Sequence, residues 1–185
     1  EIYNSSPNSI LLTGLIVRDN GVENFTVEED IVIESGGYSL FAVRQNWTQN
    51  GGMTNVDYQY DNFRFYQSDS IQLYTSTNQL IDEVNYSIIA GFPIQTGSSL
   101  SLDVSSLNST SNDSASNWCE STSIYGDGDF GTPGTTNDIC VLPKLSTELL
   151  EGDIIISEIM HTPQAVADNR GEWFEIHNTL DRPVH

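Results

Sequence analysis

The chain has 185 residues, and its 26 Asp and Glu against 6 Lys and Arg give a formal net charge of −20 at pH 7. This length suffices for one β-sandwich with a sizeable core. The acidic balance offers no basic patch for nucleic-acid phosphate, and an anionic membrane surface would repel it. No apolar run approaches the ~20 residues of a transmembrane helix. We therefore expect no nucleic-acid partner and no membrane insertion.

Short apolar runs with a period of two dominate the sequence, which predicts an all-β chain. Residues 10–18 are predicted as one strand with a kink or bulge at Gly14. A hairpin turn follows, in which Asn20-Gly21 supplies positive φ values, and residues 22–27 form the return strand.

Further strands are predicted at regular spacing, as in a sandwich or barrel. They cover residues 31–33, 38–43, 56–66 (ending at 63–66), 70–74, 79–86 and 99–103. Ser35-Gly36-Gly37 and Ser76-Thr77-Asn78 are turn signals between them. The Ser- and Asn-rich residues 105–116 predict a solvated, mobile loop.

The last quarter of the chain predicts a separate segment. Residues 141–152 are expected to be a linker with one helical turn at 145–150, and residues 153–160 and 171–178 are two strong strands. The expected domains are therefore 1–140 and 153–185. Both ends of the chain are predicted to be cuts within a longer polypeptide.

Cysteines and glycosylation sequons indicate an oxidising, extracellular or cell-surface location. Cys119 and Cys140 are predicted to form a disulfide, worth roughly 3 kcal/mol for a loop of about 20 residues; the alternative is two free thiols. The pattern Asn-x-Ser/Thr occurs at Asn4, Asn24, Asn46, Asn85, Asn108 and Asn112.

The two ends of the chain resemble each other. Glu1-Ile2-Tyr3-Asn4-Ser5 matches Glu175-Ile176-His177-Asn178-Thr179, and Ile10 falls opposite Val184. This match predicts an internal repeat.

Residues 152–163 and 171–178, which include Ser157-Glu158-Ile159 and Gly171-Glu172-Trp173, resemble the two opening strands of the lamin tail domain. Residues 1–21, 70–86 and 117–137, with the closing Gly128-Asp129-Phe130-Gly131-Thr132-Pro133-Gly134, resemble the rest of a secreted bacterial or archaeal member. The resemblance covers most of the chain and implies an immunoglobulin-like β-sandwich of the lamin-tail type.

In this resemblance the chain is circularly shifted relative to the domain: it begins inside one lamin-tail-like unit and ends inside the next. Residues 1–140 lack the opening strands, and residues 153–185 supply only those of the next repeat. These strands are expected to complete a sandwich, either in the same chain or in a neighbouring copy. The expected assembly residues are Ile154, Ile155, Ile156, Ile159, Trp173, Phe174 and Ile176.

Candidate ligand sites are few. Asp127, Asp129 and Asp138 lie in a glycine-rich loop and could bind Ca²⁺; the alternative is a polar turn cluster. Glu158, Glu172 and Glu175, and His161, His177 and His185, are weighed as acid–base or metal groups and interpreted as structural or surface residues. The aromatic side chains of residues 58–66 could line a binding face, or fill the core.

These features predict a structural module of an extracellular repeat protein, forming a fibre, sheath or surface layer with copies of itself. We expect no catalytic activity and no required cofactor, since no catalytic sequence motif is present. The alternatives are an adhesive module that uses Ca²⁺ or surface glycans, and an accessory domain of a secreted hydrolase.

Overall fold

A computed structural model describes residues 1–140, 146–180, 182 and 184. It divides into two compact units, Glu1–Cys140 and Val141–His185. Nearly all regular structure is β-strand, and the only α-helix in the described residues is α1 (Asp168–Gly171), which has four residues. The prediction of an all-β chain is confirmed at this level.

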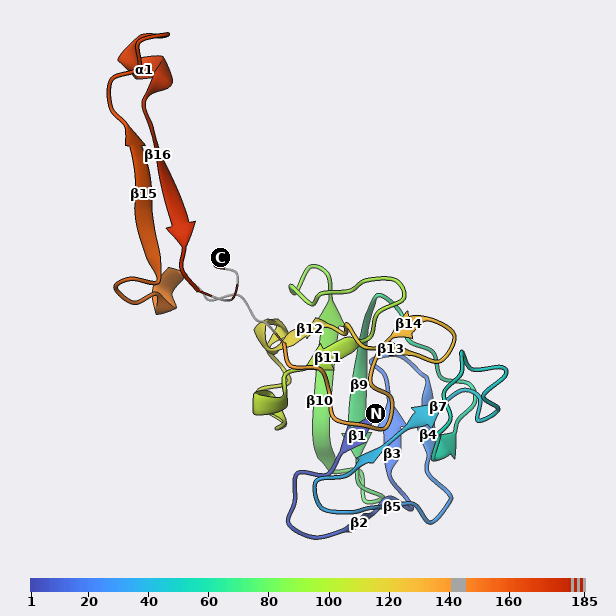
Figure 1. The fold of residues 1–185 in the computed structure, drawn as a ribbon. Coiled ribbons are helices and arrows are strands. Elements are labelled where there is room, and N and C mark those ends of the chain that lie inside the picture. The colour runs from blue at the N-terminus through green and yellow to red at the C-terminus, as the bar shows by residue number, and fades with distance from the viewer. Residues whose placement is uncertain (141–145, 181, 183, 185) are drawn as a thin grey trace. The chain divides into compact units, whose positions relative to one another are not determined.

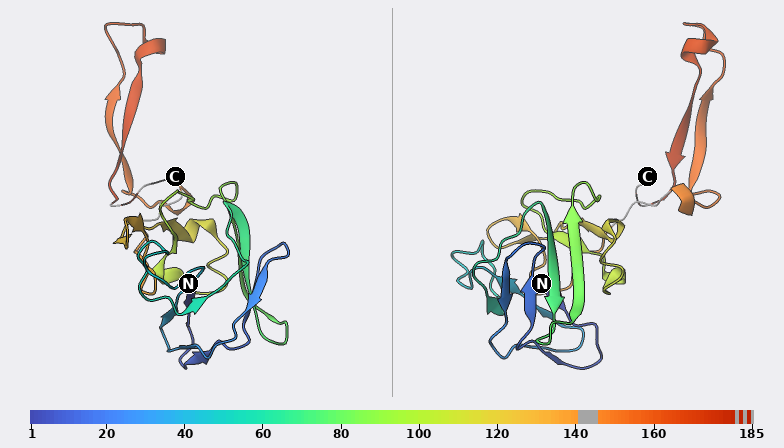
Figure 2. Two further views of the ribbon diagram at one scale, coloured as in Figure 1. Left: turned by 90° about the vertical axis from the view of Figure 1, so that its right-hand side faces the viewer. Right: turned by 180° about the vertical axis from the view of Figure 1, so that it is seen from behind.

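The first unit is built around one four-stranded antiparallel sheet of order β10-β9-β3-β4, with short strand pairs elsewhere. Figure 1 labels these elements, and in the side view of Figure 2 this sheet lies along one side of the unit. Its strands are β3 (Ile16–Arg18), β4 (Asn24–Thr26), β9 (Ser68–Tyr74) and β10 (Leu80–Ser87).

The short pairs are antiparallel except one. β1 (Ile2–Tyr3) pairs with β6 (Tyr38–Ser39), and β2 (Ile10–Leu11) pairs with β5 (Val32–Ile33). The parallel pair is β7 (Phe41–Ala42) with β8 (Tyr58–Gln59). The others are β11 (Leu100–Leu102) with β12 (Trp118–Glu120), and β13 (Ile124–Tyr125) with β14 (Asp129–Phe130). Two 3₁₀ turns, η1 (Val104–Ser106) and η2 (Ala115–Asn117), lie between β11 and β12.

The core of the first unit lies where the main sheet meets the short pairs. Its buried members are Leu12, Leu15, Val17, Val27, Ile33, Tyr58, Tyr60 and Phe63. The ring of Phe25 stacks on Tyr60, with centroids 4.8 Å apart and planes 6° apart. Ile2 of β1 packs against this cluster, which fixes one face of β1 toward the core.

The predicted strand 10–18 is wrong as a single element. Gly14 takes a φ of +84°, and the chain turns there, so that β2 pairs with β5 whereas β3 pairs with β4 and β9. Asn20-Gly21 does lie in the β3–β4 hairpin, but neither residue has positive φ. The Asp19 carboxylate shapes this turn instead, accepting hydrogen bonds from the N–H groups of Gly21 and Glu23.

Four other local predictions have mixed outcomes. The β9–β10 hairpin is confirmed, with Asn78 at φ 65° in its turn. The turn at residues 35–37 joins strands that belong to different sheets, because β5 pairs with β2 and β6 with β1. Residues 63–66 form no strand; the strand in that region is β8. The prediction of a solvated loop at 105–116 is wrong at Asn112, which is 7% exposed.

The second unit consists of η3 (Ser146–Glu148), β15 (Ile154–Met160), α1 and β16 (Trp173–Asn178). β15 and β16 form an antiparallel two-stranded sheet. Both strands were predicted, and η3 coincides with the expected helical turn. Residues 141–145 of the predicted linker lie outside the described residues.

Two loops of the first unit cross at glycines, which gives a test of the packing. Gly126 has φ +48°, and a Cβ there would collide with the carbonyl oxygen of Gly51. Gly126→Ala should therefore lower the free energy of unfolding by ~1–2 kcal/mol, because a residue with a Cβ is strained in the left-handed conformation. Overpacking against Gly51 should lower it by a further ~1–3 kcal/mol. Gly36→Ala is the control, because Gly36 has φ +72° with open space around it and should show the first penalty alone. Urea unfolding measures both; equal losses would contradict the crossing.

Candidate functional site

The β15–β16 hairpin owes its two distinct faces to a bulge. Ile156 lies opposite Ile176 and Ile159 opposite Phe174, and the register shifts between Ile156 and Glu158. Side chains alternate between the two faces of a strand, so the extra residue at Ser157 returns Ile159 to the face that carries Ile156. Without the bulge, Glu158 would occupy that place.

One face of the hairpin therefore carries only aliphatic and aromatic side chains, except at the end where Asn178 lies. We call it the apolar face, and its members are Ile154, Ile156, Ile159, Phe174 and Ile176. Ile156 and Ile159 are each 63% exposed, and Phe174 is 62% exposed. A two-stranded hairpin is marginally stable at best on its own, and an exposed contiguous apolar surface usually marks an interaction site.

The opposite face has a different character. Glu158 lies directly across from Glu175, and Ile155 across from His177. Like charges placed opposite each other are unfavourable unless solvent screens them, so the middle of this face suits water, whereas Met160 and Trp173 form an apolar pair at its end. Ile155 and Trp173, predicted as assembly residues, lie on this face by the alternation of the strands, whereas the other five predicted residues make up the apolar face.

The end of β16 repeats the local structure at the end of β1. The Oδ1 of Asn4 accepts a hydrogen bond from the N–H of Ser6 (2.9 Å), and its Nδ2 donates to the carbonyl of Asn8 (2.8 Å). Asn178 bonds in the same way, accepting from Leu180 N–H (3.0 Å) and donating to the carbonyl of Arg182 (2.8 Å). Both asparagines follow Glu-Ile-x, so the internal repeat extends from sequence to side-chain contacts.

The two copies of this motif differ in their surroundings. Asn4 is 1% exposed, and its Nδ2 also reaches the carbonyls of Ile33 (2.9 Å) and Glu34 (3.2 Å). Ile2 packs on the core, and β1 pairs with β6. Asn178 is exposed, and Ile176 is 54% exposed. The first copy of the motif is docked, and the second presents the same groups to solvent.

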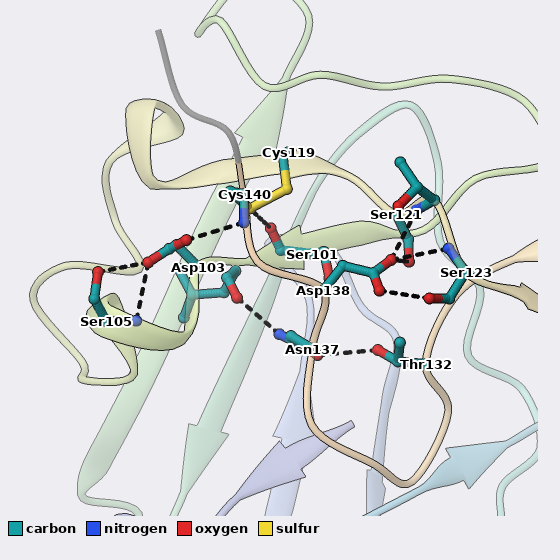
Figure 3. Close-up of a disulfide and its surroundings, with 12 residues drawn as sticks. Ser101, Asp103, Ser105, Cys119, Ser121, Ser123, Thr132, Asn137, Asp138 and Cys140 are labelled. Carbon is teal, nitrogen blue, oxygen red and sulfur yellow. Dashed lines mark hydrogen bonds between the residues drawn. A yellow bond between two sulfur atoms is a disulfide. The ribbon is translucent and has the colours of Figure 1, made fainter. Parts of the chain in front are cut away.

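The predicted disulfide is confirmed. Cys119 and Cys140 are bonded, with Cα atoms 5.6 Å apart, and the bond ties β12 to the end of the first unit. Figure 3 shows the carboxylate of Asp103 beside it, accepting hydrogen bonds from the N–H groups of Cys140 (3.0 Å) and Ser105 (2.9 Å). Burial raises the pKa of Asp103, but the bonds from Ser105 and Cys140 outweigh it and lower the pKa overall.

Asp138 acts as a turn anchor. Its carboxylate accepts hydrogen bonds from the hydroxyls of Ser121 and Ser123, both at 2.6 Å, and from the N–H groups of Thr122 and Ser123 (Figure 3). The bonds from Ser121 and Ser123 hold the pKa of Asp138 well below its usual range.

The predicted Ca²⁺ group is not assembled. Within residues 1–140, 146–180, 182 and 184, no three His, Cys, Asp or Glu side chains gather closely enough to hold a metal ion. Asp129 lies in β14, and Asp138 is bonded to the 121–123 turn. The alternative interpretation, a polar turn cluster, fits this loop better.

The six sequons fall into two structural groups. Asn24, Asn46, Asn85 and Asn108 are exposed. Asn112 is buried, and its Nδ2 donates to the Asp82 carboxylate at 2.8 Å. The Nδ2 of Asn4 is likewise occupied by hydrogen bonds. An N-linked sugar on this atom needs open space around it, so a sugar at the buried Asn4 or Asn112 is incompatible with the folded unit.

The remaining candidate residues that the structure describes lie in the core, on the surface or beside a sequence neighbour. Tyr58, Tyr60 and Phe63 belong to the core, whereas Phe65 and Tyr66 are 50% and 60% exposed. The ring of His161 bonds to its neighbour Thr162 at 2.7 Å. His185 lies outside the described residues.

No protein-family model, curated protein or solved structure matches the chain. The likeness to the lamin tail domain therefore stays a prediction from the residues quoted above. Among the described residues, no helix has the length and apolar character needed to cross a bilayer.

Asp138 should make stability depend on pH. A carboxyl whose pKa is lowered by folding stabilises the fold above the unfolded pKa, about 4 for Asp, and loses this effect as pH falls through the folded value. Asp138→Asn should therefore lower the free energy of unfolding by ~1–3 kcal/mol at pH 7. The difference from wild type should shrink steadily below about pH 4. Asp127→Asn, in the same loop, is the control and should change little; a pH-independent deficit in Asp138→Asn would contradict the assignment.

Sugar occupancy should follow burial. When the chain is secreted from a eukaryotic host, we expect modification at Asn24, Asn46, Asn85 and Asn108, and none at Asn4 or Asn112 in the folded protein. Enzymatic deglycosylation in ¹⁸O-water followed by peptide mass spectrometry reads each site separately. A sugar found on Asn4 of folded material would contradict the docking of β1.

Proposed function

We propose that the chain is a non-catalytic structural module of an extracellular repeat protein, assembled with copies of itself into a fibre, sheath or surface layer. The apolar face of the β15–β16 hairpin carries this proposal. Its five side chains are between 37% and 63% exposed. Burying such a side chain contributes on the order of 1–2 kcal/mol, so association with another β-unit is favourable.

The module is proposed to be a lamin-tail-type, immunoglobulin-like sandwich in shifted register. The order of the matched segments supports this, as does the repeat at Asn4 and Asn178. In such an arrangement the hairpin supplies the opening strands of a sandwich whose other strands resemble residues 1–140.

An extracellular setting agrees with the disulfide and with four exposed sequons. The charge of −20 keeps separate copies apart at low salt, so that a specific contact must depend on an uncharged surface. The apolar face is such a surface. Added salt should therefore strengthen assembly by screening the repulsion.

Substitutions on the two faces of β15 test the proposal. Ile156→Thr removes apolar surface from the apolar face and should weaken self-association of the full chain by about tenfold, the equivalent of ~1.4 kcal/mol. Ile155→Thr is the matched control, because it makes the same change in the same strand. It lies on the opposite face, so it should leave association within about twofold. Sedimentation velocity over a concentration series measures both.

Electron microscopy of the wild-type chain at high concentration supplies the second measurement. Regular filaments that Ile156→Thr abolishes and Ile155→Thr retains would support assembly through this face. A chain that stays monomeric at every concentration and salt level would contradict the proposed function.

A further inference from the structure

We infer that the hairpin docks on the β6 edge of a second copy of this chain, where β16 takes the place of β1. This inference rests on the proposed function and names the acceptor surface that assembly would use. The acceptor consists of β6 and the carbonyls of Ile33 and Glu34, which β1 and Asn4 occupy within a single chain.

The equivalence of the two motifs sets the register of the exchange. Ile176 corresponds to Ile2, His177 to Tyr3 and Asn178 to Asn4. In β1, Ile2 packs on the core and Asn4 is buried. The equivalent Ile176 belongs to the apolar face, and Asn178 follows it two residues on, on the same side of the strand. The face that β16 would turn toward the acceptor core is therefore the apolar face.

Docking would satisfy groups that the free hairpin leaves to solvent. The amide of Asn178 would reach the acceptor's Ile33 and Glu34 carbonyls, as Asn4 now does at 2.9 and 3.2 Å. Its bond to Arg182 is already formed, so the end of the strand is shaped before it docks. Preorganisation of this kind lowers the entropy cost of association.

The exchange also has a gain and a loss in side-chain contacts. β16 has six residues and β1 two, so Phe174 and its partners Ile156 and Ile159 would add apolar contacts that β1 does not make. The loss is the contact between Tyr3 and Tyr38, whose ring centroids are 4.9 Å apart. His177 would lie opposite Tyr38 instead.

β1 competes from within its own chain at high effective concentration. The exchange is therefore a form of strand swapping, in which an identical element from another copy replaces the internal one. Removing residues 1–4 should open the acceptor and increase association at least tenfold.

Disulfide trapping tests the register directly. Asn4 donates its N–H to the carbonyl of Gly37, so the next pair inward, Tyr3 and Tyr38, is of the non-hydrogen-bonded type, with closely spaced side chains. Full-length Tyr38→Cys and His177→Cys chains, mixed and mildly oxidised, should cross-link to each other, because neither chain alone can form this bond internally. Glu175→Cys replaces His177→Cys in the control. It leaves the apolar face intact and is two residues out of register, so its side chain lies too far from residue 38 for a disulfide and its yield should be at least fivefold lower.

Peptide mass spectrometry identifies the 38–177 link and verifies that Cys119–Cys140 is intact. A 38–177 link that rises at least tenfold on deletion of residues 1–4 supports the inference. If that deletion prevents folding, the test is made in chains that keep β1. There the yield of the 38–177 link must exceed that of the out-of-register control. Association without a register-specific link would overturn this acceptor and leave the proposed function standing. Absence of association would overturn both.

Discussion

The side-chain amide of Asn4 fastens the end of β1 to the corner between β5 and β6, and the arrangement of the first unit depends on this contact. Its Nδ2 bonds to two carbonyls at the corner, those of Ile33 and Glu34, and to the carbonyl of Asn8 in the loop after β1, while its own Oδ1 closes the turn at Ser6. A buried amide left unpaired costs about 1–3 kcal/mol. β1 is thus held in one register, which places Ile2 on the core.

The same residue type at Asn178 explains how one motif can serve in two environments. Its local bonds to Leu180 and Arg182 do not require burial, so the turn forms at an exposed strand end. The bonds that distinguish Asn4 come from the β5–β6 corner, which belongs to an acceptor and not to the motif. What separates the docked from the exposed copy is therefore the presence of a partner surface, and not the sequence of the strand.

Strands that carry their own pairing information could be predicted from the sequence. β9–β10 and β15–β16 are long, and each pairs with its neighbour in the chain. The turn at residues 35–37 has equally good local signals, but its two strands do not pair with each other. Tertiary contacts pair β5 with β2 and β6 with β1 instead. Neither the bulge at Ser157 nor the burial of Asn4 has a local signature, so the sequence cannot separate Ile155 and Trp173 from the apolar face or show that Asn4 is buried.

A contact between β16 and β6 would join two different surfaces, so each copy would carry one donor and one acceptor. Such a heterologous contact propagates in one direction unless its rotation closes a ring, or two copies exchange hairpins reciprocally. Glu158 and Glu175, opposite each other on the other face, oppose stacking of hairpins through that face. Growth would then proceed along a line of units, and the covalent order of a tandem repeat would favour this line over a closed dimer, because each hairpin is delivered to the unit that follows it.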